Sequence, residues 1–334
     1  MKFEYFIGID ISKKTLDFSV KHQYHPVFHL QVSNSREGIK DFLSSCKEYK
    51  VNLKTTLLCM EHTGIYNNIL LEFFTKKGYN LWLEQGLHIK QSLGMRRGKN
   101  DKIDSERISE YAYRFKDKCK LWQPPREVLN QLKKLTGLRS RLIKAKNILK
   151  VANTEQRGFV SHTLSKQSKR LSDPVINTME RQLDAIEKEI SSLITEDKRL
   201  KELFEIITSV EGVGPVTAWE LIVTTNEFKD ITEGKKYACY AGVAPFEHSS
   251  GTSIQGKNRV SRMANKSVKR LLHMSALSAT VMKGELHDYY MRKVAEGKNK
   301  MSVLNAIRNK LILRIFTCVR ENRKYEKFYT RSLA

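Results

Sequence analysis

The sequence predicts an α/β domain at the N-terminus, followed by helical regions that make up the rest of the chain. Within the first 120 residues, short apolar runs typical of strands alternate with patterns typical of amphipathic helices. After Pro124 and Pro125, apolar residues recur at spacings of three and four, as in paired helices. For 334 residues, ordinary domain sizes indicate roughly two or three compact units. We expect an α/β domain at 1–120, a helical coiled-coil linker at 121–200 and a mainly helical C-terminal domain at 201–334.

Five strands are predicted in the N-terminal domain. Residues 5–10 form a nearly unbroken apolar run, as in a central strand. Residues 16–20 and 28–32 alternate apolar with polar side chains, as antiparallel strands with one buried face do. The remaining strands are expected at 57–60 and 81–83. With two helices between them, the order is three strands, helix, strand, helix, strand, which is that of an RNase H-like domain.

The two helices of this domain are predicted from their apolar faces. The first is expected to bury Ile39, Phe42 and Leu43. The second is expected to bury Ile65, Ile69, Phe73 and Phe74. Gly78 stands where the C-cap of the second helix belongs.

Four carboxylates are predicted to converge at one edge of the sheet. Asp10 ends the first strand and Glu61 ends the fourth, and these strands are neighbours in a sheet of this order. Asp101 and Asp104 lead into a helix and share the stripe of its inner residue Ile108, so both are expected to point inward. Each acid alone also fits a turn or a helix start, where a negative charge complements the helix dipole. Together they favour a metal site.

Such a site is expected to bind Mg²⁺ or Mn²⁺. Burying an unpaired carboxylate costs on the order of several kcal/mol, so converging acids need compensation. Oxygen-only ligation suits these two cations. Two such ions could activate a nucleophile and stabilise the leaving oxygen of a phosphodiester.

Two apolar seams follow the proline pair. The first contains Leu135, Leu138, Leu142, Ala145 and Leu149. The second is expected to begin with Asp173 as N-cap and Pro174 in the first turn, after the basic segment 157–170. It continues through Ile176, Met179, Leu183, Ile186, Ile190 and Leu193. An antiparallel hairpin, a dimerising coiled coil, or both would produce these seams, and two core helices of a bundle fit them equally well.

The C-terminal region contains a glycine turn and two amphipathic helices. Gly212 and Gly214 lie between two helical patterns and resemble the turn of helix-hairpin-helix motifs, whose backbone N–H groups contact phosphates. A simple turn between helices fits as well, although the positive charge of the chain favours the DNA-facing interpretation. The final helices are expected to bury Leu271, Leu272 and Ala276, and Leu304, Ile307, Leu311 and Ile315.

Composition restricts the partner and the compartment. Lys and Arg number 60 against 36 Asp and Glu, a formal net charge of +24. This imbalance favours nucleic acid over a membrane, because no apolar stretch approaches the roughly 18 residues of a spanning helix. Without a signal pattern at the start, a soluble, cytoplasmic protein is expected. The five cysteines form no C-x-x-C pair, so we expect them to be reduced.

Ser250 is a candidate nucleophile, although its spacing alone favours a structural turn before Gly251. A cluster of cations follows and could hold phosphates beside the hydroxyl. Its members are Lys257, Arg259, Arg262, Lys266, Lys269 and Arg270. A serine needs a base or a metal to become a nucleophile, and His248 is the one obvious base nearby in sequence. The metal site could supply the activation.

Four motifs together resemble a known family. They read F-I-G-I-D-I-S, M-E-H-T-G, N-D-K-I-D-S and P-F-E-H-S-S-G. They resemble the insertion-sequence transposases numbered one hundred and ten, and the match spans nearly the whole chain. That family has a RuvC-like DEDD domain, a coiled-coil linker and a C-terminal domain with a nucleophilic serine. The resemblance implies metal ligands at Asp10, Glu61, Asp101 and Asp104 and a nucleophile at Ser250.

The resemblance also implies partners. They are the DNA ends of the element, its target DNA and a bridge RNA that guides many members. The apolar seams of the helical linker indicate further copies of the chain as partners, in a dimer or tetramer. A nucleoid-associated enzyme is expected. Two positions depart from the pattern: Ser105 stands where an alanine often follows the last acid, and Ser249 precedes Ser250. Ser250 is preferred because the serine directly before glycine fits the motif.

Two other functions account for part of the sequence. A RuvC-like structure-selective endonuclease, such as a Holliday-junction resolvase, would use water as nucleophile and need no serine. A non-catalytic nucleic-acid-binding scaffold would explain the charge and the apolar seams but not the four acids. The residues alone, without the resemblance, predict a metal-dependent enzyme that cleaves phosphodiesters and has a basic, helical C-terminal domain.

Overall fold

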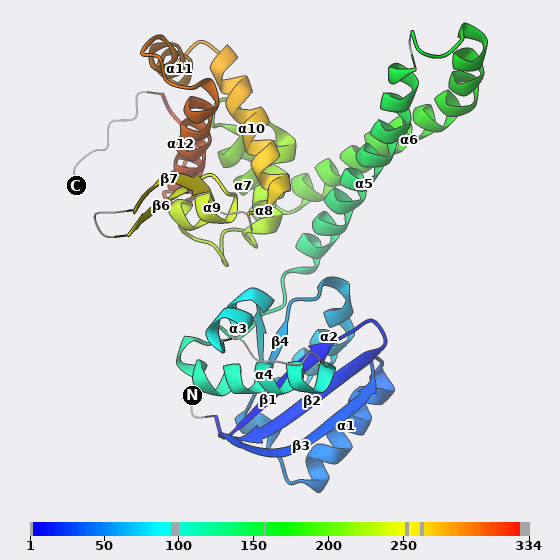
Figure 1. Ribbon diagram of the computed structural model, residues 1–334, viewed down its shortest axis with the longest axis vertical. Coiled ribbons are helices and arrows are strands. Elements are labelled where there is room, and N and C mark those ends of the chain that lie inside the picture. Colours follow the sequence, from blue (N-terminus) through cyan, green and yellow to red (C-terminus); the bar gives the residue numbers. More distant parts are fainter. Residues whose placement is uncertain (1–2, 95–99, 157, 251–253, 261–263, 328–334) are drawn as a thin grey trace. The chain divides into compact units, whose positions relative to one another are not determined.

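The computed structural model describes residues 3–94, 100–156, 158–250, 254–260 and 264–327, with the backbone alone described at 246–250 and 254–259. The chain divides into two compact units, Met1–Pro124 and Pro125–Ala334 (Figure 1). Each unit is described by itself. Arg262 and Gly251, on which parts of the sequence interpretation rest, lie outside the described residues.

The first unit is built on a mixed five-stranded sheet. Its strands are β1 (Tyr5–Ile11), β2 (Thr15–His22), β3 (His25–Ser33), β4 (Thr56–Glu61) and β5 (Asn80–Glu84). Their order across the sheet is β3-β2-β1-β4-β5. The first three strands are antiparallel, whereas β4 runs parallel to β1 and β5 parallel to β4. The predicted meander and the adjacency of β1 and β4 are confirmed, and the arrangement is consistent with an RNase H-like domain.

Helices cover both faces of this sheet. On one face, α1 (Arg36–Glu48) and α2 (Asn68–Lys76) pack around Ile7 and Ile9 of β1. On the other face, α3 (Gly86–Ser92) and α4 (Asp101–Arg114) pack around Phe6 of the same strand. Successive side chains of a strand point to opposite faces, so β1 is buried on both. Its nearly continuous apolar run is explained by this position.

The predicted inner face of α2 was partly wrong. Ile65 is 75% exposed and Ile69 is 40% exposed, whereas Leu70 and Phe74 are buried. The reason is a 3₁₀ turn, Gly64–Asn67, ahead of the helix. A 3₁₀ helix has three residues per turn, whereas an α-helix has 3.6. The 3₁₀ turn therefore rotates the apolar face of the helix that follows it. Gly78 follows α2 with a φ of +70°, as predicted for the end of this helix.

A long helical hairpin begins the second unit. It consists of α5 (Glu127–Glu155) and α6 (His162–Glu196), which pack against each other (Figure 1). One end of the hairpin enters the core of the unit through Leu129, Leu132 and Ile190. Of the predicted seam residues, Leu138 is 40% exposed. Of the arrangements that the sequence left open, the structure therefore contains the antiparallel hairpin.

The predicted start of α6 at Asp173 and Pro174 was wrong, because both residues lie inside the helix. The helix begins at His162, and the Ser161 side chain caps it. Polar contacts to α5 hold this additional segment. The buried Asn153 donates a hydrogen bond to the Ser172 Oγ at 2.6 Å and accepts one from the Ser168 Oγ at 3.1 Å. Proline has no N–H group and so interrupts the hydrogen bonds of a helix. Hydrogen bonds to a neighbouring helix, such as these, stabilise a helix that continues past a proline.

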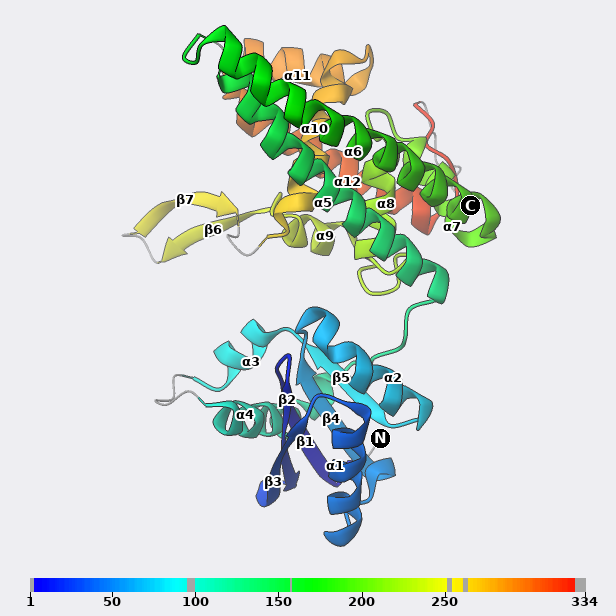
Figure 2. The same ribbon diagram turned by 90° about the vertical axis from the view of Figure 1, so that its right-hand side faces the viewer.

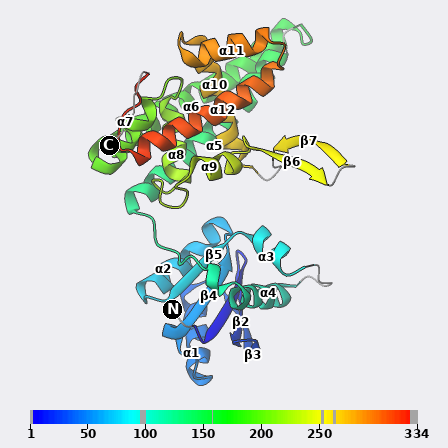
Figure 3. The same cartoon turned by 90° about the vertical axis from the view of Figure 1, so that its left-hand side faces the viewer.

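The remainder of the second unit surrounds one apolar core. Its elements are α7 (Lys198–Thr208), α8 (Pro215–Thr224), α9 (Gly234–Tyr240), β6 (Pro245–Ser250), β7 (Ile254–Val260), α10 (Lys266–Val281), α11 (Glu285–Ala295) and α12 (Lys300–Arg320). The predicted inner residues of α12 are buried, as are Leu272 and Ala276 of α10, whereas Leu271 is half-buried. The antiparallel pair β6–β7, which extends from the helices (Figures 2 and 3), was not predicted.

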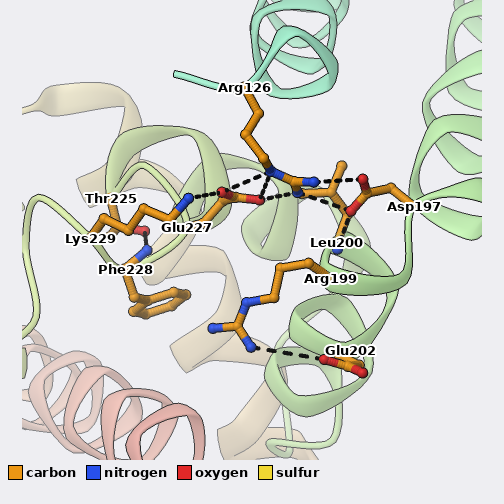
Figure 4. Close-up of polar contacts among 9 residues, drawn as sticks. All are labelled: Arg126, Asp197, Arg199, Leu200, Glu202, Thr225, Glu227, Phe228 and Lys229. Carbon is orange, nitrogen blue, oxygen red and sulfur yellow. Dashed lines mark hydrogen bonds and ion pairs between the residues drawn. The ribbon is translucent and has the colours of Figure 1, made fainter. Parts of the chain in front are cut away.

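An ion-pair network ties the first residues of this unit to its core (Figure 4). The Arg126 guanidinium donates to the Asp197 Oδ2 at 2.7 Å and, through its Nε, to the Glu227 Oε1 at 3.0 Å. Lys229 donates to the other Glu227 oxygen at 2.7 Å. Glu227 is held in the left-handed region at a φ of +57°, and its side chain is fully buried. The network fixes the point where the chain enters the second unit.

The helices and the cysteines bear on two further expectations. Within the part that the structure describes, none of the helices combines the length and the apolar character needed to cross a bilayer. The cysteines are free thiols rather than disulfides, as expected: Cys46, Cys59, Cys119, Cys239 and Cys318.

Candidate active site

The sheet brings the first two predicted acids to the same edge. β1 and β4 run parallel, and Ile9 pairs with Met60. Asp10, the penultimate residue of β1, and Glu61, the last residue of β4, follow these residues and lie at the same edge of the sheet. Both side chains are half-buried. The sequence prediction for these two residues is matched by the geometry.

Close packing of α4 on β1 positions the other two acids, Asp101 and Asp104. A Cβ on Gly8 would stand 2.1 Å from the Ser105 carbonyl oxygen and 2.2 Å from the Ser109 nitrogen, so only glycine permits this approach. Ser105 and Ser109 are fully buried beneath it. The Ser105 hydroxyl donates to the Lys102 carbonyl at 2.8 Å, which satisfies the polar group that replaces the expected alanine.

The predicted inward orientation of the first turn of α4 holds only in part. Asp104 has a side chain 32% exposed, and Asp101 is exposed. The Asn100 side chain caps the helix by accepting from the Ile103 N–H at 2.7 Å. Because the close contact with β1 begins at Ser105, the preceding turn lies at the end of the strand rather than beneath the sheet. Both acids therefore stand beside Asp10 and remain open to solvent.

The charges of these residues act on one another. Burial, followed by the charges of Asp101, Asp104, Glu61 and Asp17 in that order, raises the pKa of Asp10 to about 6. Burial followed by the charge of Asp104 also raises the pKa of Glu61, while Lys90 opposes this shift. A carboxylate surrounded by like charges is held in an unfavourable ionised state. The four predicted acids thus form one electrostatic cluster, which we call the carboxylate cluster.

The carboxylate cluster provides the oxygen ligands that a divalent cation prefers. Gly86 leaves space beside the backbone for one of these ligands, the Glu61 carboxylate. A Cβ on Gly86 would lie 2.4 Å from the Glu61 Oε2, so the absence of a side chain there leaves room for this carboxylate. Among the residues whose side chains are described, no three acid, histidine or cysteine groups lie close enough to hold an ion as they stand. The donor chemistry fits Mg²⁺ or Mn²⁺.

The loop after Glu61 is fixed by a buried asparagine. The Asn67 side chain donates to the Glu61 carbonyl at 2.8 Å and accepts from the Thr63 N–H at 2.7 Å and the Thr63 hydroxyl at 2.8 Å. Asn67 is 1% exposed. It positions the end of β4, and hence Glu61, in a way that the M-E-H-T-G motif did not reveal.

Sequence reasoning missed several charged neighbours of the cluster. Asp17 pairs with Asp10 across β1 and β2 and is buried, where it accepts hydrogen bonds from His29 at 3.1 Å and Gln31 at 2.9 Å. Arg107 lies 4.0 Å from the Asp104 Oδ1. Alternation places Asp17 on the polar face of β2, opposite Leu16 and Phe18, and this face is buried because α4 packs against the strand, so the sequence pattern did not identify it.

The candidate nucleophile lies in the second unit. Ser250 is the last residue of β6 and pairs with Ile254 of β7. The side chains of Ser250, Ser249, His248, Lys257 and Arg259 lie outside the described residues. Lys266, Lys269 and Arg270 occupy the first turns of α10. The structure thus adds a strand pair where the sequence indicated only a turn.

The glycine turn has a packing role at its first residue. Gly212 has a φ of +83°, and a Cβ there would lie 2.6 Å from the Ser275 carbonyl oxygen of α10. Close packing therefore explains Gly212. Gly214 is exposed, has no neighbouring atoms within 4 Å of a Cβ position, and directly precedes α8. Its backbone is the part of this turn that remains open to a phosphate.

Comparisons with known proteins identify the family of this chain. Residues 7–155 match the DEDD family model described as a transposase. Residues 204–291 match the model described as the transposase IS116/IS110/IS902 family. The first match contains all four members of the carboxylate cluster, and the second contains β6, β7 and the start of α10.

Curated relatives match over different lengths. The pilin gene-inverting proteins of Moraxella bovis and Moraxella lacunata are each 25% identical over 328 residues, 96% of this chain and 98% of theirs. An uncharacterised 43.6 kDa protein of insertion element IS110 from Streptomyces coelicolor is 31% identical over 157 residues, 46% of this chain and 38% of its own. The chain belongs to the IS110/IS116/IS902 family of transposases, with a DEDD N-terminal and a Transposase_20 C-terminal domain.

Proposed function

We propose that this protein is a DNA recombinase of an insertion sequence that cleaves and rejoins DNA with the carboxylate cluster and Ser250. Membership of a transposase family implies DNA cleavage and joining. The observation that supports the metal-dependent mechanism is the mutual repulsion of Asp10, Glu61, Asp101 and Asp104 at one sheet edge. A bound cation would offset the repulsion that, together with burial, raises the pKa of Asp10 and Glu61.

The side chains of the cluster have distinct roles in this proposal. Bound Mg²⁺ or Mn²⁺ would offset their charge and stabilise the charge that develops on a reacting phosphodiester. Asp10 and Glu61 are fixed by the sheet, so they define the position of the site. Asp101 and Asp104 lie on the solvent side, where they would complete the set of ligands for the cation. Ordered acids on rigid elements keep the reacting groups within the geometry that catalysis requires.

Ser250 is proposed to become covalently joined to DNA. Its Oγ would form a bond to phosphorus while a bond from phosphorus to a strand oxygen breaks and the departing oxygen takes up a proton. The reverse reaction rejoins strands, because the phosphoserine conserves the energy of the broken phosphodiester. Lys257, Arg259, Arg262, Lys266, Lys269 and Arg270 are proposed to hold the DNA backbone nearby.

A covalent trap tests the serine. A DNA substrate carrying the element's ends and a nick that prevents rejoining should accumulate a protein–DNA adduct, detected by denaturing electrophoresis and located by peptide mapping. Ser250→Ala should abolish the adduct, and Ser249→Ala should retain it. An adduct that persists in Ser250→Ala would move the nucleophile to Ser249 or another residue.

A guide RNA and further copies of the chain are proposed as partners. Two relatives that match nearly the whole of this chain are named pilin gene-inverting proteins, so we propose that a protein of this architecture can carry out site-specific inversion. Sequencing RNA that copurifies with the protein, together with the DNA flanking the gene, tests whether a bridge RNA encoded beside the gene specifies the sites. Absence of an enriched element-derived RNA would contradict this part of the proposal.

A structure-selective endonuclease is the second candidate. The observation that favours it is that all four acids lie in the first unit, which a water-using nuclease could employ without Ser250. Such an enzyme would release free DNA ends and form no adduct. Free ends from both wild type and Ser250→Ala would support this alternative.

A further inference from the structure

One buried cation in the second unit lacks the partner that buried charges normally have. Arg308, on α12, is 5% exposed. Its Nε has no hydrogen-bond partner, and within the described part of the chain no carboxylate pairs with it. Burial lowers the pKa of its guanidinium, and no acid in the described part of the chain opposes this effect. An unpaired buried charge is strongly unfavourable, so its presence calls for a ligand of opposite charge.

Two more basic side chains from α10 surround this guanidinium. Lys269 and His273 are one helical turn apart on α10, which packs beside α12 (Figures 1 and 3). Both are half-buried, and burial followed by the charge of Arg308 lowers the pKa of each. The Nδ1 of His273 has no hydrogen-bond partner among the described residues. The charge of Arg270 lowers the pKa of Glu220, and among the described residues no acid shifts the pKa of Arg308, Lys269 or His273.

The group lies at the root of the β6–β7 strand pair. Asn305, one turn before Arg308 on α12, donates to the Val243 carbonyl at 2.8 Å, two residues before β6 begins. Asn265 caps α10 and donates through its side chain to the Tyr240 hydroxyl at 2.8 Å. These contacts fix both helices to the segment that leads into β6.

We propose that Arg308, Lys269 and His273 form a binding site for a backbone phosphate of DNA. The inference rests on the proposed function insofar as the ligand is DNA, but it requires neither the serine chemistry nor a metal. A guanidinium binds two phosphate oxygens through parallel N–H bonds, while the lysine and histidine supply further donors. A phosphate in this position would be held beside the strand pair that ends at Ser250. The stability lost by burying an unpaired arginine would be recovered on binding.

The test measures DNA binding by the full chain without divalent ions, so that no cleavage occurs. The probe is a fluorescently labelled duplex carrying the element's ends, followed by anisotropy across a range of salt concentrations. Arg308→Met removes the charge at similar length, and Arg320→Met, on the same helix with a side chain 70% exposed, is the matched control. We expect Arg308→Met to weaken binding by about tenfold and to reduce the log–log salt slope by about 1. The control should leave both nearly unchanged.

Thermal unfolding separates this role from a structural one. Without DNA, Arg308→Met should unfold at the same or a higher temperature than wild type, because the substitution removes an unpaired buried charge. Inorganic phosphate should raise the unfolding temperature of wild type more than that of Arg308→Met. If Arg308→Met fails to fold, Lys269→Gln and His273→Gln, which change partly exposed residues, should each weaken DNA binding in the same direction.

Two results would overturn the proposal. One is equal DNA affinity and equal salt slope for wild type, Arg308→Met and Arg320→Met. The other is a large loss of thermal stability in Arg308→Met together with unchanged DNA binding by Lys269→Gln and His273→Gln, which would assign the arginine a structural role. Because cleavage is not measured, failure of the serine mechanism leaves these outcomes unaffected.

Discussion

Gly8 of β1 lies directly against Ser105 of α4, where a Cβ on the glycine would stand 2.1 Å from the serine carbonyl oxygen. This contact determines how far α4 lies from the sheet. Asp104 and Asp101 occupy the turn immediately before Ser105, so the same contact sets their distance from Asp10. A glycine and a buried serine thus position the carboxylate cluster without belonging to it.

Gly8→Ala should displace α4 and impair the carboxylate cluster. Overpacking of a close interface costs about 1–3 kcal/mol in unfolding free energy, measurable by denaturant titration. Recombination should fall further than stability accounts for, since Asp101 and Asp104 move. Gly137→Ala, inside α5 with its nearest atom 3.7 Å from the Cβ position, is the control and should be neutral or stabilising. Full activity in Gly8→Ala would show that the spacing of α4 is not important.

Asp10→Asn should abolish recombination while leaving the fold intact. Without metal, the substitution should not destabilise the protein, because it removes a charge that burial and neighbouring acids disfavour. Mg²⁺ at a hundredfold excess over its dissociation constant should increase the free energy of unfolding of wild type by about 2.7 kcal/mol. The unfolding temperature should rise accordingly. That increase should be absent in Asp10→Asn. Asp17→Asn, a buried acid held by His29 and Gln31, should retain it.

Asp104→Asn should behave like Asp10→Asn in the recombination assay. Asp104 is the acid whose charge acts on both Asp10 and Glu61, so its loss removes a shared member of the cluster. DNA binding should be largely retained, as measured by anisotropy. Recombination at near wild-type rate by either variant would show that the metal site is assigned to the wrong residues.

Arg126→Met should destabilise the second unit and change its response to acid. Burial alone would raise the pKa of Glu227, but hydrogen bonds from Arg126 and Lys229 outweigh it and hold the pKa below the ordinary 4.5. Arg126 likewise holds the pKa of Asp197 below 3.8. Folded protein therefore binds fewer protons than unfolded protein, so this stabilisation is present above about pH 4.5 and is lost as the pH falls through the lowered values.

The loss at neutral pH should be about 3 kcal/mol, at the lower end for a buried pair because the Arg126 side chain is 38% exposed. Denaturant titrations between pH 3 and 7 should show that the variant has lost the acid-sensitive part of its stability. Arg199→Met is the matched control, since its contact with Glu202 is exposed and 3.9 Å long (Figure 4). It should change stability by less than about 1 kcal/mol. Equal losses in the two variants would contradict the role of the buried pair.

The sequence was most informative where local pattern and burial agree. The apolar run of β1 and the alternation of β2 and β3 determine the sheet, and with it the meeting of Asp10 and Glu61. The face of α2 was mispredicted because a 3₁₀ turn shifts its phase, which spacing alone does not reveal. The start of α6 was mispredicted because Asn153, a residue distant in sequence, stabilises a helix through Pro174.

Tertiary contacts explain what else was missed. Arg308 lies on an apolar helix face, and its lack of a partner is visible only once α10 and α12 are side by side. Asn67 falls within the predicted second helix, and its role becomes visible only through its bond to the Glu61 carbonyl. The strand pair β6–β7 is rich in Ser, Gly and charged residues, which favour turns, so no strand pattern stood out.

The last prediction concerns pairing of protomers through the hairpin of α5 and α6. Leu164, Leu171 and Val175 are 57%, 65% and 45% exposed, and their spacings of seven and four place them on one face of α6. Such a stripe is typical of a helix that packs against another helix, and a second copy of the chain is the partner we propose. Wild type should therefore sediment as a dimer or tetramer, and the double variant Leu164→Glu, Leu171→Glu should sediment as a smaller species. Val281→Glu, at an 80% exposed position on α10, should not change the mass.

The same variants test whether protomers share an active site. If the serine of one copy works with the carboxylate cluster of another, a mixture of inactive Asp10→Asn and inactive Ser250→Ala proteins should recover part of the recombination. Introducing the two hairpin substitutions into both proteins should remove that recovery, because pairing is lost. Recovery that survives these substitutions would place the pairing surface elsewhere. A monomeric wild type, active alone and without recovery in the mixture, would show that each chain supplies its own serine and acids.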